Sequence, residues 1–167
     1  LATMRSAGFK IIPTITDGTD KLVLAKLLAK SSDRASVIKP IVDLVMSKNF
    51  DGIDLDFEGF AFVDGTASWP TTKPNWVLFV KELSAALHAN GKLLSITAPV
   101  HFALTEKQKG YTVYAWAEIA QYIDRLRIMT YDYSTGKPGP IGPIAWVERT
   151  VKYAISVMPA TKVYVGL

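Results

Sequence analysis

The chain has 167 residues, 49% of them hydrophobic and 20% charged, and carries a net charge of +4. This composition excludes a disordered chain and is typical of a single folded domain with its own core. The positive charge is mild and dispersed, so we expect no nucleic-acid partner and at most weak attraction to anionic polymers such as cell wall. The sequence lacks an apolar run long enough to span a membrane, and it lacks the cysteines needed for disulfides or thiolate metal sites.

Helical and extended patterns alternate along the whole chain. In chain order we expect a helix over residues 1–7 ended by Gly8, a strand over 9–15, a helix over 20–30, and a helix over 31–48 in which Pro40 joins two pieces. We then expect an acidic strand ending at Glu58, a long loop over 60–73, a helix over 74–89, a strand over 92–98, a helix over 113–122, a strand over 125–131, a turn-rich loop over 137–143, a helix over 144–157 and a strand over 162–165. Such alternation predicts an α/β fold with a parallel sheet.

The acidic strand is the most informative stretch of the chain. Its acids Asp54, Asp56 and Glu58 alternate with Ile53, Leu55 and Phe57. In a strand such alternation puts the three carboxyl groups in one row, about 6.6 Å apart, and the apolar side chains on the opposite face. Carboxyl groups this close inside a protein cannot all ionise, so at least one pKa is raised, as a general acid requires. Glu58 would stand at the carboxyl end of the strand, where α/β proteins bind ligands.

Two other interpretations of the acidic row remain open. A calcium-binding loop also carries acids at alternate positions, but it uses glycine and polar residues between them rather than Ile, Leu and Phe. The row could also be a structural ion network or a divalent-metal site, since such networks perturb pKa values too.

The acidic row resembles the signature of family 18 glycoside hydrolases, the chitinase family. The matching run is Asp51-Gly52-Ile53-Asp54-Leu55-Asp56-Phe57-Glu58, in which Phe57 stands where the family usually has Trp. A second run, Met129-Thr130-Tyr131-Asp132-Tyr133, resembles the family's Met-Thr-Tyr-Asp segment. The resemblance implies an α/β fold of the (β/α)8 TIM-barrel type, here incomplete, with about strands 3 to 7 covered. Residues 1–167 would be one catalytic-domain portion of that barrel.

The resemblance also implies an activity and a set of site residues. The activity is substrate-assisted hydrolysis of β-linked N-acetylglucosamine polymers, chitin-like or peptidoglycan, without a cofactor or metal ion. The implied catalytic residues are Glu58 as acid and base, Asp56 as the acetamide-orienting group, Asp54 as its proton-sharing neighbour and Tyr131 as a donor to the acetamide oxygen. Asp132 would help to hold the sugar ring in a distorted shape. We expect Tyr133, His101 and Trp69 as weaker candidates for substrate contact.

Finer expectations concern the branch, the location and an inactive alternative. Residues 139–148 resemble the spore-cortex, peptidoglycan-processing branch of the family, which points to wall polymer as substrate. An extracellular or wall-associated location follows from such a substrate, although no signal is visible in the chain. The alternative is a catalytically inactive, chitinase-like lectin, against which the presence of Glu58 argues. The pattern gives no indication of the oligomeric state.

Overall fold

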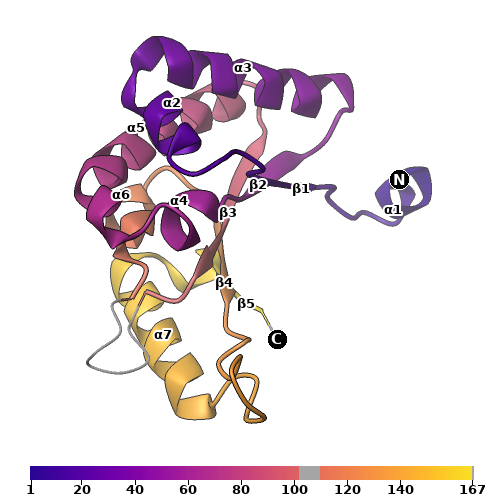
Figure 1. Cartoon of the computed structure of the whole chain (residues 1–167). Coiled ribbons are helices and arrows are strands. Elements are labelled where there is room, and N and C mark those ends of the chain that lie inside the picture. The colour runs from indigo at the N-terminus through magenta and orange to yellow at the C-terminus, as the bar shows by residue number, and fades with distance from the viewer. Residues whose placement is uncertain (102–109, 167) are drawn as a thin grey trace.

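A single sheet of five parallel strands forms the centre of the computed structural model, which describes residues 1–101 and 110–166 (Figure 1). The strands lie side by side in the order of the sequence. They are β1 (Thr14–Thr16), β2 (Gly52–Asp56), β3 (Leu93–Pro99), β4 (Arg125–Met129) and β5 (Val163–Val165). This order confirms the predicted run of consecutive, parallel α/β units.

Helices follow the strands and gather on one face of the sheet, to the left of the strands in Figure 1, while α1 stands apart near the N-terminus. The α-helices are α1 (Ala2–Ser6), α2 (Val23–Ala29), α3 (Ser31–Ser47), α4 (Gly59–Phe62), α5 (Trp69–His88), α6 (Trp116–Ile119) and α7 (Ile144–Val157). The described part of the chain also has three short 3-10 turns: η1 (Thr66–Ser68), η2 (Thr112–Tyr114) and η3 (Ala160–Lys162). None of the helices in the described ranges combines the length and apolar character that crossing a bilayer requires.

The structure corrects the sequence-based prediction at both internal prolines. The predicted loop over 60–73 contains α4, η1 and the start of α5, because Pro70 lies at the second position of that helix, where its missing N–H costs nothing. Pro74, predicted to start the helix, lies inside it. Likewise α3 is one continuous helix across Pro40, and its residues Ile38 and Ile41 are buried on either side of that proline. Packing against the core therefore outweighs the single backbone hydrogen bond that each proline removes.

Other predicted elements are shortened rather than misplaced. The strand expected over 9–15 is regular only at Thr14–Thr16, directly after Pro13, which has no N–H for a ladder. The helix expected over 113–122 is divided into η2 and α6 at Ala115, whose φ of 53° is left-handed. β4 ends at Met129, two residues before the predicted end. The helix over 144–157 is confirmed as α7.

The apolar face of β2 anchors the core. Ile53 and Leu55 are completely buried and Phe57 is 5% exposed, so all three pack under the helices as their alternation predicts. Trp76 of α5 and Trp116 of α6 are also completely buried. The opposite face of β2 carries Asp54 and its polar neighbours, so the strand separates the apolar core from a polar site.

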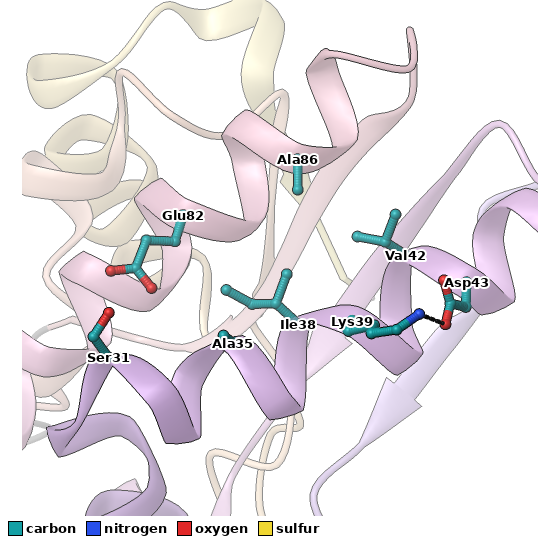
Figure 2. Close-up of a pocket in the computed structure, with 8 residues that line it drawn as sticks. All are labelled: Ser31, Ala35, Ile38, Lys39, Val42, Asp43, Glu82 and Ala86. Atoms are coloured by element: carbon teal, nitrogen blue, oxygen red, sulfur yellow. Dashed lines mark hydrogen bonds and ion pairs between the residues drawn. The ribbon is translucent and has the colours of Figure 1, made fainter.

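A charged contact joins α3 to α5 on the outer, helical side of the sheet. The Arg34 guanidinium donates two hydrogen bonds to the Glu82 carboxylate, at 2.7 and 2.9 Å, and a third to the Leu28 carbonyl at 2.9 Å. Figure 2 shows Glu82 at the edge of a shallow pocket between these helices, with the exposed Lys39–Asp43 ion pair along α3. Because this pocket lies on the helical side, it is separate from the acidic face of β2.

Replacing Glu82 by Ala should destabilise the fold by about 2 kcal/mol. Breaking a buried pair leaves an uncompensated charge and costs about 3–5 kcal/mol. The side chain of Glu82 is 35% exposed, whereas that of Arg34 is 7% exposed, so water offsets part of that cost. The matched control is Asp43→Ala in the exposed Lys39–Asp43 pair, for which we expect less than about 0.5 kcal/mol. Urea unfolding measures both values, and equal losses in the two variants would contradict the assignment.

Candidate active site

The acidic row begins on β2 but does not end on it. Asp54 and Asp56 lie on the strand, whereas Glu58 follows its end and is the N-cap residue of α4. The Glu58 backbone, at φ −109° and ψ −22°, is helical rather than extended. The prediction of one continuous strand through Glu58 is therefore wrong, because the chain turns into α4 after Phe57. Glu58 still stands directly beyond the carboxyl end of the strand, at the edge where parallel sheets bind ligands.

Asp54 is completely buried, and three side chains from other strands of the sheet surround its carboxylate. Its Oδ2 accepts hydrogen bonds from the Thr14 hydroxyl at 3.0 Å and the Thr97 hydroxyl at 2.8 Å. The Arg127 guanidinium lies 3.4 Å from the same oxygen. Donors from β1, β3 and β4 thus compensate the burial of this carboxylate and fix its position.

The pKa of Asp56 is raised above its usual value. Burial of the carboxyl group is the largest cause and the negative charge of Asp54 is the second, while Arg127 partly opposes both. The Oδ1 atoms of Asp54 and Asp56 are both buried, and neither has a hydrogen-bond partner among the described residues. Asp56, whose pKa is raised, and the neighbouring Asp54 thus each have a carboxyl oxygen that can share a proton or receive one from a ligand.

The pKa of Glu58 is also raised. Its side chain opens to solvent, yet burial against the surrounding protein is the largest cause, and the charge of Asp56 adds to it. Both causes favour the protonated acid over the carboxylate. A carboxyl group that stays protonated closer to neutral pH, and that solvent or a ligand can reach, has the properties of a general acid.

Tyr131 lies two residues past β4 and close to these acids. Burial raises the pKa of its phenol, and the charges of Asp56, Asp132 and Glu58 raise it further. The ring packs against Gly166, where an added Cβ would come within 2.9 Å of the ring carbon Cε1. The neighbouring Thr130 hydroxyl donates a hydrogen bond to the Gly166 carbonyl. The structure therefore brings Tyr131, predicted from a separate motif, into the electrostatic field of Asp56 and Glu58.

The two residues after Tyr131 lie in different surroundings. Asp132 is exposed and adopts a left-handed φ of 58°, a strained conformation for a residue other than glycine. Tyr133 is half-buried, and its ring packs edge-on against Trp146 with 5.2 Å between the ring centres. Its backbone N–H donates to the Ile141 carbonyl at 2.9 Å. Substrate contact by either residue stays a prediction, although Tyr133 clearly serves to hold the loop onto α7.

His101 and Trp69, the other two predicted substrate-binding residues, lie in aromatic surroundings. His101 stacks on Tyr153 with 4.2 Å between ring centres. Burial of the imidazole and the charge of Lys73 lower the pKa of His101, while the charge of Glu118 partly opposes them. None of the acids of β2 contributes to that shift. Trp69 is the first residue of α5 and is 8% exposed. Its ring lies tilted against that of Tyr111, with 6.1 Å between ring centres. Its role as a sugar-stacking surface stays a prediction, and burial leaves little of its ring for a ligand.

Several residues around the acids were missed from the sequence. Arg127 and the two threonines that bond Asp54 alternate with apolar residues on their strands, which could have indicated that they face the acidic row. Tyr111 and Tyr114 precede α6. Burial is the largest cause of the raised pKa of each phenol, and the charge of Glu58 is the second. Among residues 1–101 and 110–166, no group of three or more metal-ligating side chains is arranged to hold a metal ion.

Comparison with known proteins identifies the family. The family model "Glycosyl hydrolases family 18" matches residues 1–167. The Bacillus subtilis protein named "Putative sporulation-specific glycosylase YdhD" is 25% identical over 162 residues, which cover 93% of this chain and 36% of that protein. The Bacillus subtilis cortical fragment-lytic enzyme is 25% identical over 142 residues, which cover 84% of this chain and 31% of the enzyme. The chain thus spans about a third of the length of these relatives.

Solved structures give the same result for the fold. The crystal structure of YdhD superposes with a TM-score of 0.84 at 23% identity, covering 99% of this chain and 54% of that one. The structure of a class V chitinase from Pseudomonas fluorescens Pf-5 superposes with a TM-score of 0.83 at 29% identity, covering 99% and 52% of the two chains. The five-stranded sheet is accordingly part of a TIM-barrel fold, as predicted. The chain belongs to glycosyl hydrolase family 18.

Proposed function

We propose that this chain carries the acid/base centre of a glycosidase that hydrolyses β-linked N-acetylglucosamine polymers with retention of configuration. The observation that carries the proposal is the convergence of Glu58, Asp56 and Tyr131 from two separate segments, with the pKa of all three groups raised. A glycosidase needs a protonated acid at the glycosidic oxygen, and Glu58 is the acid that stands outside the strand and reaches solvent.

In the proposed reaction Glu58 transfers its proton to the glycosidic oxygen as the bond to the anomeric carbon breaks. The oxygen of the substrate's own 2-acetamido group attacks that carbon and forms a cyclic oxazolinium ion. Glu58, now a carboxylate, then takes a proton from water as the water oxygen opens the ring. This sequence uses one acid/base residue and explains why no second carboxylate is needed as nucleophile.

The groups next to Glu58 are proposed to bind and polarise the substrate's acetamido group, whereas Glu58 acts on the glycosidic oxygen. Asp56, whose Oδ1 has no partner among the described side chains, would accept the acetamide N–H and stabilise its developing positive charge. Asp54 would share a proton with Asp56, and its fixed position between Thr14, Thr97 and Arg127 makes it suited to that task. Tyr131, kept protonated by its raised pKa, would donate its hydroxyl proton to the acetamide carbonyl.

The substrate is proposed to be a chitin-like polymer or peptidoglycan, acted on outside the cell or at the wall. The relatives include a protein named as a sporulation-specific glycosylase and a class V chitinase, which supports this pair of substrates. Purified protein should release reducing ends from chitooligosaccharides or from peptidoglycan, and release far less from the same polymers after N-deacetylation. A protein that binds these polymers but releases no reducing ends would instead support the lectin alternative.

Substituting Asp56 by Asn should move the alkaline limb of the pH–rate profile to lower pH. Activity requires protonated Glu58, so it falls as the pH rises through the pKa of that acid. The Asp56 charge raises that pKa, and removing a negative neighbour lowers it. The rate also falls because Asp56 is itself proposed to contact substrate, so the pH midpoint of kcat is the quantity to measure. An unchanged or higher midpoint would show that Asp56 does not set the pKa of Glu58.

A further inference from the structure

The hydroxyl group of Tyr114 holds the peptide that leads into Glu58. Tyr114 is completely buried at the end of η2, and its hydroxyl donates a hydrogen bond to the Phe57 carbonyl at 2.7 Å. That carbonyl and the backbone N–H of Glu58 belong to the same peptide group. Because a peptide group is planar, fixing its oxygen also fixes the orientation of the Glu58 backbone.

The Phe57–Glu58 peptide lies beyond the strand pairing of the sheet. The pairing of β2 with β3 extends from Gly52 to Leu55, and its pairing with β1 ends at Asp56. Phe57 and Glu58 lie beyond both ladders, and α4, which follows, is a helix of four residues. A tyrosine from a segment 57 positions away therefore supplies the donor that a strand would supply elsewhere.

Tyr114 is itself fixed from a second direction. The indole Nε1 of Trp76, a completely buried residue of α5, donates to the Tyr114 carbonyl at 3.1 Å. The ring of Phe60 packs against both, 4.9 Å from Tyr114 and 5.0 Å from Trp76 between ring centres, and the Trp76 and Tyr114 rings meet edge-on at 6.1 Å. The hydrogen bond and the packed rings give Tyr114 one position, so its hydroxyl meets the Phe57 carbonyl at a defined place.

We propose that Tyr114 is a positioning residue that aims the Glu58 carboxyl through the Phe57–Glu58 peptide. This inference rests on the proposed function of Glu58 and extends it to a residue that makes no contact with substrate. The titratable groups whose interaction with Glu58 is resolved are Asp56, Tyr111, Tyr131 and Tyr114 itself. Tyr114 stands out among them because it also bonds to the backbone of the acidic motif.

The test removes one oxygen atom from Tyr114 in the full-length protein. We expect Tyr114→Phe to lower kcat on a chitooligosaccharide about 10- to 100-fold while KM changes less than about twofold, because a small misplacement of the acid affects the chemical step. The alkaline limb of kcat should move to lower pH, since a loosened Glu58 turns toward solvent and loses the burial that raises its pKa. The matched control is Tyr122→Phe, at a half-buried tyrosine three residues before β4, which should leave both quantities unchanged.

A second measurement does not depend on activity. A ¹³C NMR titration follows the Glu58 side-chain carboxyl, assigned by its loss in Glu58→Gln. We expect its pKa to fall in Tyr114→Phe and, by a smaller amount, in Trp76→Phe, which removes the donor to Tyr114. Folded variants with unchanged kcat and unchanged Glu58 titration would overturn the inference. Wild-type protein without glycosidase activity would instead overturn the proposed function, and the titration would still decide the role of Tyr114.

Discussion

Glu58→Gln should lower kcat on chitooligosaccharides by about 10³-fold, within the range that general acid catalysis contributes. The amide keeps the size and polarity of the side chain but has no proton to give to the glycosidic oxygen. Glu58 is exposed and is not an N-cap hydrogen-bond acceptor, so the fold should tolerate the change. Reducing-end release measures kcat and KM, and we expect KM to change less than about threefold.

The matched control for Glu58 is another exposed glutamate. Glu148 on α7 pairs with Lys152 one helical turn away, and Glu148→Gln should keep kcat within twofold of the wild-type value. Equal release of reducing ends by wild type and Glu58→Gln would remove Glu58 from the catalytic role. Equal loss in both variants would show that the assay responds to surface charge rather than to the acid.

Gly52→Ala should destabilise the protein by about 3 kcal/mol, at the upper end of what overpacking costs. A Cβ at this position would lie against the Leu93 carbonyl oxygen and within 2.8 Å of the Leu93 Cβ. The clash is with the backbone of β3, so no rotamer change relieves it, and β2 must move away from its neighbour. Because β2 carries Asp54 and Asp56, we also expect the folded fraction of this variant to lose activity.

A second glycine provides the comparison for Gly52. At Gly136 an added Cβ would meet no atom within 4 Å, and its φ is not left-handed. Gly136→Ala should therefore change the unfolding free energy by less than about 0.5 kcal/mol. Chemical denaturation measures both variants. A loss at Gly52 no greater than that at Gly136 would contradict the close approach of β2 and β3.

The parts of the fold that follow a strong local pattern were predictable from the sequence. Ile53 and Leu55 alternate with acids, and this pattern gave both the strand and its buried face. The pattern could not show where the strand stops, because Phe57 and Glu58 continue the alternation although β2 ends at Asp56 and the backbone is helical at Glu58. Proline misled the prediction at Pro40 and Pro74, since burial of the flanking helix faces outweighs a local preference.

The candidate site was predictable only where its residues stand in a motif. Glu58, Asp56 and Tyr131 were found through two recognisable segments, and the structure brings them within electrostatic reach of one another. Arg127 and Tyr114 were missed because their roles depend on partners 73 and 57 positions away. The alternation on β4 indicates the face on which Arg127 lies, but no local pattern names its partner, because the contacts form only when β4 pairs beside β3 and η2 packs against α5.

The most direct test of the account is the configuration of the sugar that is first released. ¹H NMR of a chitooligosaccharide during hydrolysis should show the β-anomer appearing first, because attack by the acetamido oxygen and then by water inverts the anomeric carbon twice. The N-deacetylated oligosaccharide should not be cleaved under the same conditions. Initial release of the α-anomer, or cleavage of both substrates at similar rates, would contradict substrate assistance at Glu58, Asp56 and Tyr131.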